Sequence, residues 1–264
     1  MRSLIFFIFF CACTLQAQDS LEVSASPLDT VISLKAETFI GVDSYNNLYY
    51  VNGRALYKKS QDKTIQFSDL RLGTISSVDL LNPLRITVFY AETNTAVILD
   101  NTLNEITRVN FNAIKNFRNV SHARTASDRR LWIFNTDLQR LELFDYQNNR
   151  VVSNFTPQPD IALELASDFN TCWVLTEDNL YHYNQYGSLL EKLPSGAIES
   201  LAVYDEKLLS IQNEKLYIKS KTKTFWQEVK NLPQGAKAFY LKAGNLYLYH
   251  SELISIYKLK LPKS

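Results

Sequence analysis

The residues of this chain with the clearest chemical potential are aspartates that precede similar apolar runs. Four lie in the turn before such a run and a fifth lies near the equivalent place: Asp43, Asp79, Asp168, Asp205 and Asp128. Carboxylates gathered on one face of a molecule could bind cations or sugars. Aspartate is also common in turns, because its carboxylate accepts hydrogen bonds from backbone N–H groups two residues further on. Recurrence once per repeat, without an Asp-x-Asp-x-Asp calcium loop, favours this structural role.

Histidine and cysteine add few candidates. His122, His182 and His250 do not form a His-Glu-x-x-His motif, and none is separated from a cysteine by the sequence spacing of a metal-binding motif. Distant repeats could still bring them together at a central opening. Cys172 lies in an apolar run beside Trp173, which is typical of an inert packing thiol. With no Gly-x-Ser-x-Gly motif and no glycine-rich phosphate loop, we assign no catalytic, cofactor-binding or metal-ligating residue and expect no cofactor.

The first residues predict export. A positive start at Arg2 precedes the apolar run from Leu4 to Cys13, and small and polar residues follow before Asp19. This is the order of a secretory signal peptide, and about ten apolar residues are too few to span a bilayer. We expect residues 1–18 to be the signal peptide and residues 19–264 to form one domain. A lipoprotein acylated at Cys13 is a second interpretation, although Phe10 and Cys11 fit such a signal poorly.

Charge and cysteine content limit the partners. The chain has 28 basic and 27 acidic residues, and removal of the signal takes away only Arg2, so the mature net charge is near zero. This balance argues against nucleic acid, which needs clustered positive charge. A basic stretch from Lys215 to Lys230 contains aromatic residues and is interpreted as a solvated strand pair. Because Cys172 is the one cysteine after the signal, we expect no intrachain disulfide, and no later segment is apolar enough for a transmembrane helix.

The elements that position these residues recur at a regular spacing. Six segments rich in β-branched and aromatic residues have the following central residues: Tyr49, Thr87, Trp132, Trp173, Leu209 and Tyr247. The steps between them are 38, 45, 41, 36 and 38 residues. A period near forty residues is typical of a propeller blade, which is one four-stranded sheet packed against its neighbours.

Further alternating runs accompany each central segment. A second run follows in every repeat, as in Ala55–Tyr57 and Ala96–Leu99, and many repeats add a third, as in Thr64–Phe67. A preceding run is visible at Phe39–Val42 and Leu201–Tyr204. Alternation without a sustained 3.6-residue period indicates strands. The sequence therefore predicts an all-β, six-bladed propeller with four strands in each blade.

The two ends of the chain predict how the ring closes. The last repeat has three runs and ends at Ser264 without a fourth, whereas an extra run, Thr30–Leu34, precedes the first repeat. Three strands at one end and one at the other make a complete blade. We expect Val31–Leu34 to pair with the outer edge of the last blade, which would cover an exposed strand edge.

These repeats resemble known propellers. The segment Val42–Val51, with its Asp-Ser-Tyr-Asn-Asn turn, looks like the repeats of the NHL, Kelch-like and two-component-regulator sensor groups. The segment from Val78 to Asp100, together with Leu15-Gln16-Ala17-Gln18 at the signal end, resembles small exported propellers of gliding Gram-negative bacteria. The resemblance covers residues 30–260 and implies fold rather than chemistry.

Three functions fit these observations. We favour a non-enzymatic protein-interaction scaffold in the periplasm or at the outer membrane, as an accessory subunit of a secretion, outer-membrane assembly or gliding complex. A hydrolase or lyase with its site in the central channel is an alternative. A carbohydrate-binding propeller is another, and it would require exposed aromatic residues near Trp226, Tyr183 or Tyr186.

Overall fold

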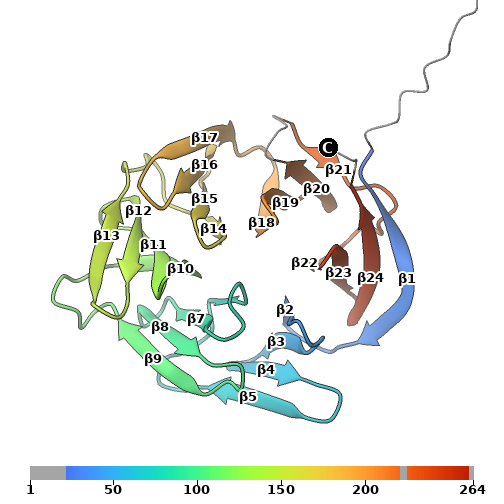
Figure 1. Ribbon diagram of the computed structural model, residues 1–264, viewed down its shortest axis with the longest axis horizontal. Helices are drawn as coiled ribbons and strands as arrows, with labels where there is room; N and C mark the ends of the chain where they lie inside the picture. Colours follow the sequence, from blue (N-terminus) through green and yellow to red (C-terminus); the bar gives the residue numbers. More distant parts are fainter. Residues whose placement is uncertain (1–21, 221–224, 262–264) are drawn as a thin grey trace, which may run out of the picture.

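The computed structural model describes residues 22–220 and 225–261 of the chain. These residues form a ring of six antiparallel sheets around a central opening, and each sheet has four strands (Figure 1). The predicted all-β, six-bladed propeller is therefore confirmed. The predicted signal peptide, with Cys13, lies outside the described residues. In the part of the chain that is described, no helix is long and apolar enough to cross a membrane.

The blades follow the repeats along the chain. Blade 1 comprises β2 (Thr38–Val42), β3 (Leu48–Asn52), β4 (Ala55–Lys59) and β5 (Thr64–Ser68). Blade 2 comprises β6 (Ser77–Asp79), β7 (Ile86–Tyr90), β8 (Thr95–Leu99) and β9 (Glu105–Asn110). Blade 3 comprises β10 (Val120–Thr125), β11 (Arg130–Asn135), β12 (Arg140–Asp145) and β13 (Arg150–Asn154).

The second half of the ring has the same plan. Blade 4 comprises β14 (Glu164–Ser167), β15 (Thr171–Leu175), β16 (Asn179–Asn184) and β17 (Leu189–Pro194). Blade 5 comprises β18 (Ile198–Tyr204), β19 (Lys207–Gln212), β20 (Lys215–Ser220) and β21 (Gln227–Glu228). Blade 6 comprises β22 (Ala238–Lys242), β23 (Asn245–His250), β24 (Leu253–Lys260) and the first strand of the chain, β1 (Ser24–Ser33).

Strand β1 closes the ring, as the two chain ends predicted. It pairs antiparallel with β24, with Val31 opposite Ser255 and Ile32 opposite Ile254. The strand is longer than the expected run, because pairing resumes beyond an irregularity between Pro27 and Val31 and continues to Ser24. Figure 1 shows β1 along the outer edge of blade 6, next to β24.

The beginning of β1 also reaches blade 5. The backbone N–H of Ala25 donates to the Lys230 carbonyl at 3.0 Å, and the Lys230 N–H donates to the Val23 carbonyl at 2.9 Å. Val23 and Ala25 are buried in a cluster with core residues of blades 5 and 6, among them Leu209 and Leu246. The first strand therefore stabilises the boundary between the last two blades as well as completing the last one.

The core of the molecule lies between the blades. Six clusters of buried apolar residues occupy the six blade boundaries, and each cluster draws residues from two neighbouring sheets. Strands β7 and β8, in the middle of blade 2, are buried along their whole length. Each sheet thus buries apolar side chains against the next one around the ring, which is the packing expected of a propeller.

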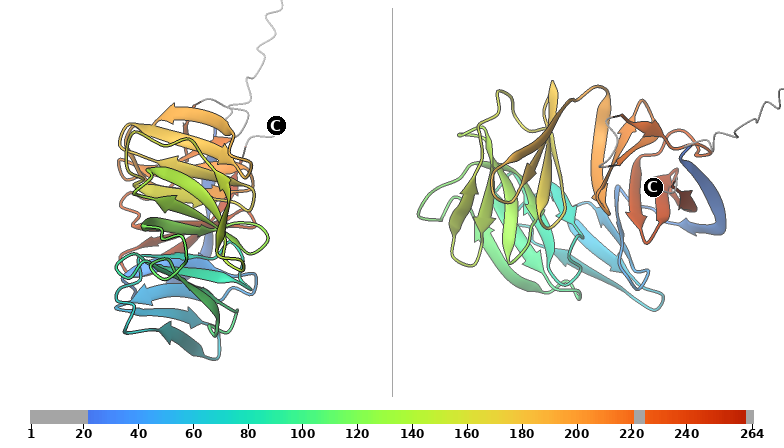
Figure 2. Two further views of the ribbon diagram at one scale, coloured as in Figure 1. Left: turned by 90° about the vertical axis from the view of Figure 1, so that its left-hand side faces the viewer. Right: turned by 45° about the horizontal axis from the view of Figure 1, so that its top comes forward.

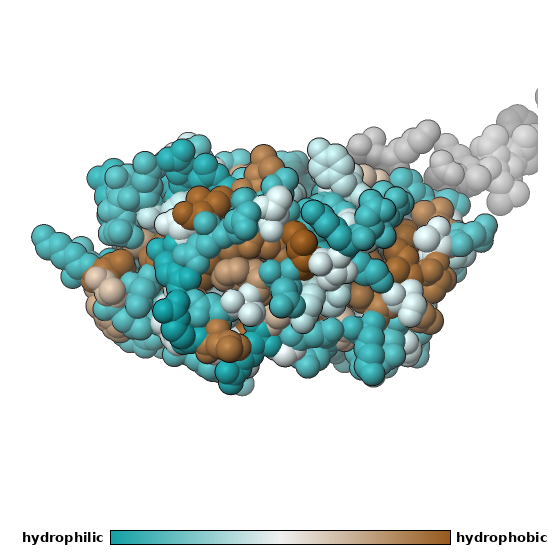
Figure 3. Space-filling model, turned by 90° about the horizontal axis from the view of Figure 1, so that it is seen from below, coloured by the Kyte–Doolittle hydropathy of each residue, from teal (hydrophilic) through white to brown (hydrophobic). Residues whose placement is uncertain are grey.

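The two flat faces of the ring carry different loops. Antiparallel strands turn at alternating ends, so the first and third turns of blades 1 to 4 and the first turns of blades 5 and 6 lie on one face, which we call the hairpin face. The second turns and the loops between blades lie on the other, the crossover face. The views in Figure 2 show the blades side by side around this flat ring. Seen from the edge in Figure 3, hydrophobic residues are scattered among hydrophilic ones over the rim.

Non-glycine residues form many of the tight turns. Several turns have two successive residues with positive φ, including Asn213 and Glu214 between β19 and β20, and Ser251 and Glu252 between β23 and β24. Two positive φ values are the signature of the type I′ turn, whose twist matches that of the flanking strands. The chain has 7 glycines, and asparagine and aspartate, which tolerate this conformation, fill many of these positions.

Candidate functional site

Asp43 is the most extensively bonded of the repeating aspartates. Its carboxylate accepts hydrogen bonds from the backbone N–H groups of Tyr45 at 2.9 Å and Asn47 at 3.0 Å, and from the Tyr49 hydroxyl at 3.1 Å. It also forms an ion pair with Lys58 Nζ at 3.1 Å. Burial acts to raise the pKa of Asp43, but these bonds, led by one from the Asn47 side-chain amide at 2.8 Å, hold it below its ordinary value. All of these partners of the Asp43 carboxylate belong to blade 1.

Asp79 and Asp168 are also turn caps. The Asp79 carboxylate accepts the Leu81 backbone N–H at 2.9 Å, and that of Asp168 accepts the Asn170 N–H at 2.7 Å. The second oxygen of Asp79 accepts the Thr125 N–H of blade 3 at 2.8 Å, so this side chain also links two blades. The predicted structural role is confirmed for these two residues and for Asp43.

Asp128 and Asp205 have a different role, which corrects the prediction. Each occupies the first of two positive-φ positions, with φ of 54° for Asp128 and 48° for Asp205. Two successive positive-φ positions demand residues that tolerate left-handed backbone, and aspartate is one of the few non-glycine residues that does. The Asp205 carboxylate instead pairs with Lys207 Nζ at 2.9 Å.

The three histidines lie at separate sites. His122 Nε2 contacts the Leu163 carbonyl at 3.1 Å, and burial, reinforced by the nearby Arg124 charge, lowers the His122 pKa. The His182 ring stacks on Trp173 with centroids 4.0 Å apart, and His250 Nδ1 contacts the Ser251 hydroxyl at 3.1 Å. Over residues 22–220 and 225–261, no three His, Cys, Asp or Glu side chains are grouped closely enough to hold a metal ion.

Cys172 and the candidate sugar-binding aromatic residues are mostly buried. The Cys172 thiol is fully buried, and desolvation raises its pKa well above the ordinary value, in agreement with an inert packing role. Tyr183 is also buried, where its hydroxyl accepts a hydrogen bond from the Gln158 amide. Trp226 packs partly buried against core residues, whereas Tyr186 is exposed at a turn tip.

A central cavity of about 530 Å³ is lined by residues of the inner strands of the ring. Its charged groups include Arg124 on β10 and Glu164 on β14, with Arg124 Nη2 3.8 Å from Glu164 Oε1. Tyr240 on β22 lines it too, and burial raises the Tyr240 pKa to about 12. A Cβ atom on Gly41 would lie 2.6 Å from the Tyr240 ring, so the seam between blades 6 and 1 requires glycine there.

The charged side chains of this cavity join neighbouring blades. Arg124 Nε of blade 3 donates to the Leu165 carbonyl of blade 4 at 2.9 Å, and its Nη1 reaches the Val78 carbonyl of blade 2 at 3.4 Å. Glu164 Oε2 accepts the Leu201 N–H of blade 5 at 2.8 Å. These contacts hold four consecutive blades together around the opening.

Glu164 makes stability depend on pH. Burial raises its pKa from 4.5 to about 7, against the opposing effects of Arg124 and the Leu201 N–H. The folded state therefore holds the proton more tightly than the unfolded chain, and the resulting stability, full below pH 4.5, is lost as pH rises through 7. We expect the unfolding free energy of the wild type to fall by about 2–3 kcal/mol over this range, relative to Glu164→Gln. Urea unfolding of both proteins at a series of pH values measures the difference, and parallel pH profiles would contradict it.

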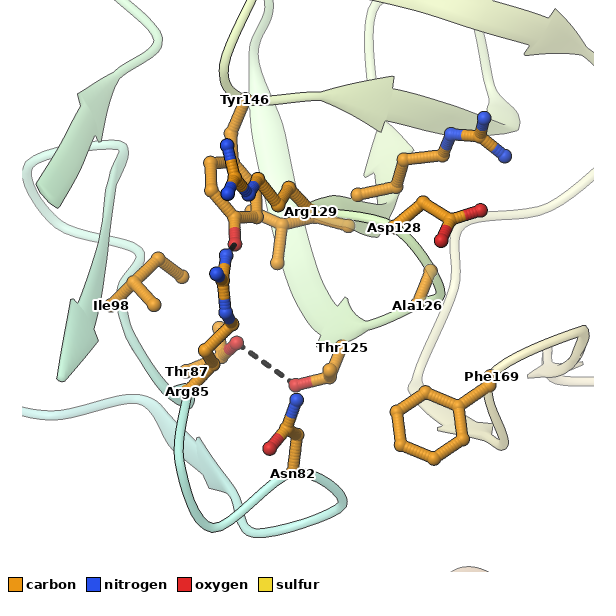
Figure 4. A pocket seen from close by; sticks show the side chains of 12 residues that line it. Asn82, Arg85, Thr87, Ile98, Thr125, Ala126, Asp128, Arg129, Tyr146 and Phe169 are labelled. Atoms are coloured by element: carbon orange, nitrogen blue, oxygen red, sulfur yellow. Dashed lines mark hydrogen bonds between the residues drawn. The ribbon is translucent and has the colours of Figure 1, made fainter. Parts of the chain in front are cut away.

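A second, smaller cavity of about 270 Å³ opens between blades 2 and 3 on the hairpin face (Figure 4). We call it the arginine cleft, after three of its lining residues: Arg85, Arg129 and Arg130. Arg85 Nη1 donates to the Tyr146 hydroxyl at 3.1 Å. Deeper in the cleft, the buried hydroxyls of Thr87 and Thr125 are 2.9 Å apart and bonded to each other.

These cleft residues are not among the candidates expected from the sequence, although the sequence carries part of the signal for them. Arg85 and Arg130 stand at equivalent places, immediately before the apolar part of two successive central segments. In the other repeats this place is occupied by uncharged residues or a lysine: Asn47, Thr171, Lys207 and Asn245. An alignment of the repeats would have shown two arginines in neighbouring blades. It could not have shown that Tyr146, from a third turn, joins them.

The blades and the closing strand define the class of this protein, a six-bladed β-propeller with an inter-blade basic cleft. No protein-family model and no curated protein matches the sequence. The fold resembles PorZ, an essential bacterial surface component of the type-IX secretion system of Porphyromonas gingivalis, with a TM-score of 0.52 and 15% identity. That match covers 83% of this chain and 31% of PorZ, so the chain spans less than a third of that protein.

Two further solved structures cover most of both chains. BamB from Moraxella catarrhalis is 10% identical with a TM-score of 0.52, and the match covers 94% of this chain and 96% of BamB. A gluconolactonase from Xanthomonas campestris is 12% identical with a TM-score of 0.60, covering 89% of this chain and 97% of the enzyme. At identities this low, the structural matches show a shared fold and no more. Propellers of this fold include enzymes as well as proteins without catalytic activity.

Proposed function

We propose that this protein is a non-enzymatic interaction scaffold in the periplasm or at the outer membrane. In this role it would be an accessory subunit of a secretion, outer-membrane assembly or gliding complex. The apolar and aromatic side chains at the tips of the hairpin-face turns carry the proposal. Tyr45 is 83% exposed, Tyr186 is 80% exposed and Leu84 is 66% exposed. Tyrosine is enriched among residues that dominate protein interfaces, and loops on a rigid ring are suited to contact a partner.

Two other observations support a scaffold. Three of the turn aspartates use their carboxylates to cap their own turns, so these groups serve the fold: Asp43, Asp79 and Asp168. The resemblance to PorZ, a surface component of a secretion system, together with the signal-like first residues, favours the envelope. The mature net charge near zero is in keeping with a protein partner rather than nucleic acid.

Affinity purification from detergent-solubilised envelopes tests the proposal. We expect the tagged protein to recover a stoichiometric partner, and Tyr45→Ser combined with Tyr186→Ser to reduce that recovery at least tenfold, because exposed interface tyrosines contribute about 1–2 kcal/mol or more each. Leu70→Ser is the matched control, since Leu70 is 72% exposed on the crossover face. Its recovery should equal that of the wild type. Failure to recover any stoichiometric partner would contradict the scaffold role.

An enzyme with its site in the central channel is the second candidate. It is favoured by Glu164, whose pKa near 7 would suit proton transfer, beside Arg124 in the central cavity. A screen of hydrolase and lyase substrates on the purified protein tests it. Turnover that Glu164→Gln abolishes would replace the scaffold proposal with this one.

A further inference from the structure

The arginine cleft is rich in positive charge. Three arginines and one aspartate, Asp128, line it, which leaves two positive charges in excess. Among residues 22–220 and 225–261, no carboxylate forms an ion pair with Arg85, Arg129 or Arg130, whereas most other buried or half-buried charges in this ring have one. Figure 4 shows the Asp128 carboxylate pointing away from Arg85. The positive charge of the cleft is therefore not neutralised from within.

The neutral polar groups of the cleft present hydrogen-bond donors. Tyr146 accepts the Arg85 N–H, which leaves its own hydroxyl proton to donate. In the Thr87 and Thr125 pair one hydroxyl donates to the other, so one proton remains. The side-chain oxygen of Asn82 accepts the Leu84 N–H at 3.1 Å, and its NH₂ group is a donor. Donors around an excess of guanidinium charge constitute an anion site.

One side of the cleft is apolar. Phe169, from the first turn of blade 4, lines one side and is 39% exposed, and its ring faces the cleft in Figure 4. Leu84, next to Arg85, is 66% exposed on the same face. A ligand that places its negative group among the arginines would therefore lay neighbouring apolar atoms on Phe169, with Leu84 exposed on the same face. An acidic side chain within an apolar peptide segment has this pattern.

We propose that the arginine cleft binds a carboxylate side chain from an acidic and apolar segment of a protein partner. The proposal rests on the scaffold role and names the chemistry of the partner. Arg85 is the central residue, because its bond to Tyr146 holds the guanidinium across the boundary between blades 2 and 3. A planar guanidinium pairs with a planar carboxylate through two parallel N–H bonds, which is the strong geometry for this contact.

Calorimetric titration with a peptide probe tests the proposal. The probe is the acetylated and amidated hexapeptide Glu-Leu-Glu-Leu-Glu-Leu, compared with the same peptide carrying Gln for Glu and with inorganic phosphate. We expect the Glu peptide to bind, and Arg85→Gln to weaken it by about 10- to 100-fold, the worth of one charge-assisted pair. Arg129→Gln, at an exposed residue, should weaken it in the same direction. Arg54→Gln, which removes the same charge on the crossover face, should leave the affinity unchanged.

Several results would overturn this assignment. The first is an Arg85→Gln variant that is correctly folded and binds the Glu peptide with the affinity of the wild type. The second is a wild type that binds the Gln peptide as tightly as the Glu peptide. The others are a wild type that does not bind the Glu peptide at millimolar concentration, or that binds phosphate in preference to it. Repeating the envelope purification with Arg85→Gln separates this inference from the scaffold role. Full partner recovery with that variant would overturn the cleft assignment alone, whereas a wild type that binds the peptide but recovers no partner would contradict the scaffold role alone.

Discussion

A chain that begins at Lys35, and therefore lacks β1, is expected to lose its cooperative native fold. Deletion removes seven residue pairs of the ladder with β24, from Ser24–Lys260 to Ser33–Leu253. It also removes the buried side chains of Val23, Ala25 and Leu34. Ladder bonds contribute about 1 kcal/mol each and buried aliphatic side chains about 1.5–3 kcal/mol each. Together these losses are comparable with the whole stability of a typical domain, about 5–15 kcal/mol.

Circular dichroism melts and limited proteolysis measure this loss. A chain that begins at Glu22 is the control, because it retains β1 and the contacts of its first residues with Lys230. We expect the control to unfold in one cooperative transition and the shorter chain to have none, with β24 left as a free edge open to self-association. A sharp transition in the shorter chain would show that the other five blade boundaries suffice.

Two neighbouring substitutions test the seating of β1 more finely. Ile32 packs partly buried against the cluster at the seam between blades 6 and 1, whereas the adjacent Val31 is 59% exposed. Ile32→Asp should destabilise the protein by about 2 kcal/mol or more because it brings a carboxylate against apolar atoms. Val31→Asp, the same change on the solvent side, should stay within about 0.5 kcal/mol. Equal effects of the two variants would mean that β1 does not have this register.

Glu142→Ala is expected to have the next largest effect. Glu142 is fully buried on β12, where one carboxylate oxygen accepts Arg118 Nε at 2.8 Å and the other accepts Arg140 Nη2 at 2.9 Å. Arg118 and Arg140 are themselves only 17% and 24% exposed. Removal of the carboxylate leaves two half-buried cations without their shared counter-charge. Loss of one partner of a buried pair costs about 3–5 kcal/mol, and urea unfolding should show a decrease of this size.

Two comparisons separate charge from packing at this site. Glu142→Gln keeps the shape and one acceptor but removes the charge, so it should recover part of the loss suffered by the alanine variant. Glu177→Ala removes an exposed glutamate from the β15–β16 turn and should change stability by less than about 0.5 kcal/mol. If Glu142→Ala resembled Glu177→Ala, the Arg118–Glu142–Arg140 group would not stabilise the fold.

Most of the strands could be predicted from the local alternation of apolar and polar residues in the sequence. The six central segments correspond to strands β3, β7, β11, β15, β19 and β23. Strands β10 and β17 were not singled out, because β10 reads Val-Ser-His-Ala-Arg-Thr and β17 reads Leu-Leu-Glu-Lys-Leu-Pro, and neither alternates apolar with polar residues. An inner strand that faces the polar cavity and an outer strand that faces solvent have little apolar periodicity, so the pattern signal is weakest there.

The turn aspartates show that local sequence also predicts the roles of single residues only in part. A carboxylate that caps its own turn depends on contacts within a few positions, and the prediction holds for Asp43, Asp79 and Asp168. It fails at Asp128 and Asp205, where the aspartate itself occupies a positive-φ position of the turn. The residue type is the same in both cases, and the position of the aspartate within the turn decides between capping and left-handed backbone, because Asp128 and Asp205 have positive φ and the three capping aspartates do not.

The sequence by itself determined the number of blades, the order of the strands and the closure of the ring. These features depend on periodicity, which neighbouring residues carry along the chain. The tertiary structure alone decided which polar side chains meet. Arg85 and Tyr146 are 61 positions apart and touch only because blades 2 and 3 pack together. A contact between two blades depends on the angle and distance between their sheets. Because all the packed side chains contribute to that angle and distance, no spacing of residues along the sequence predicts the contact.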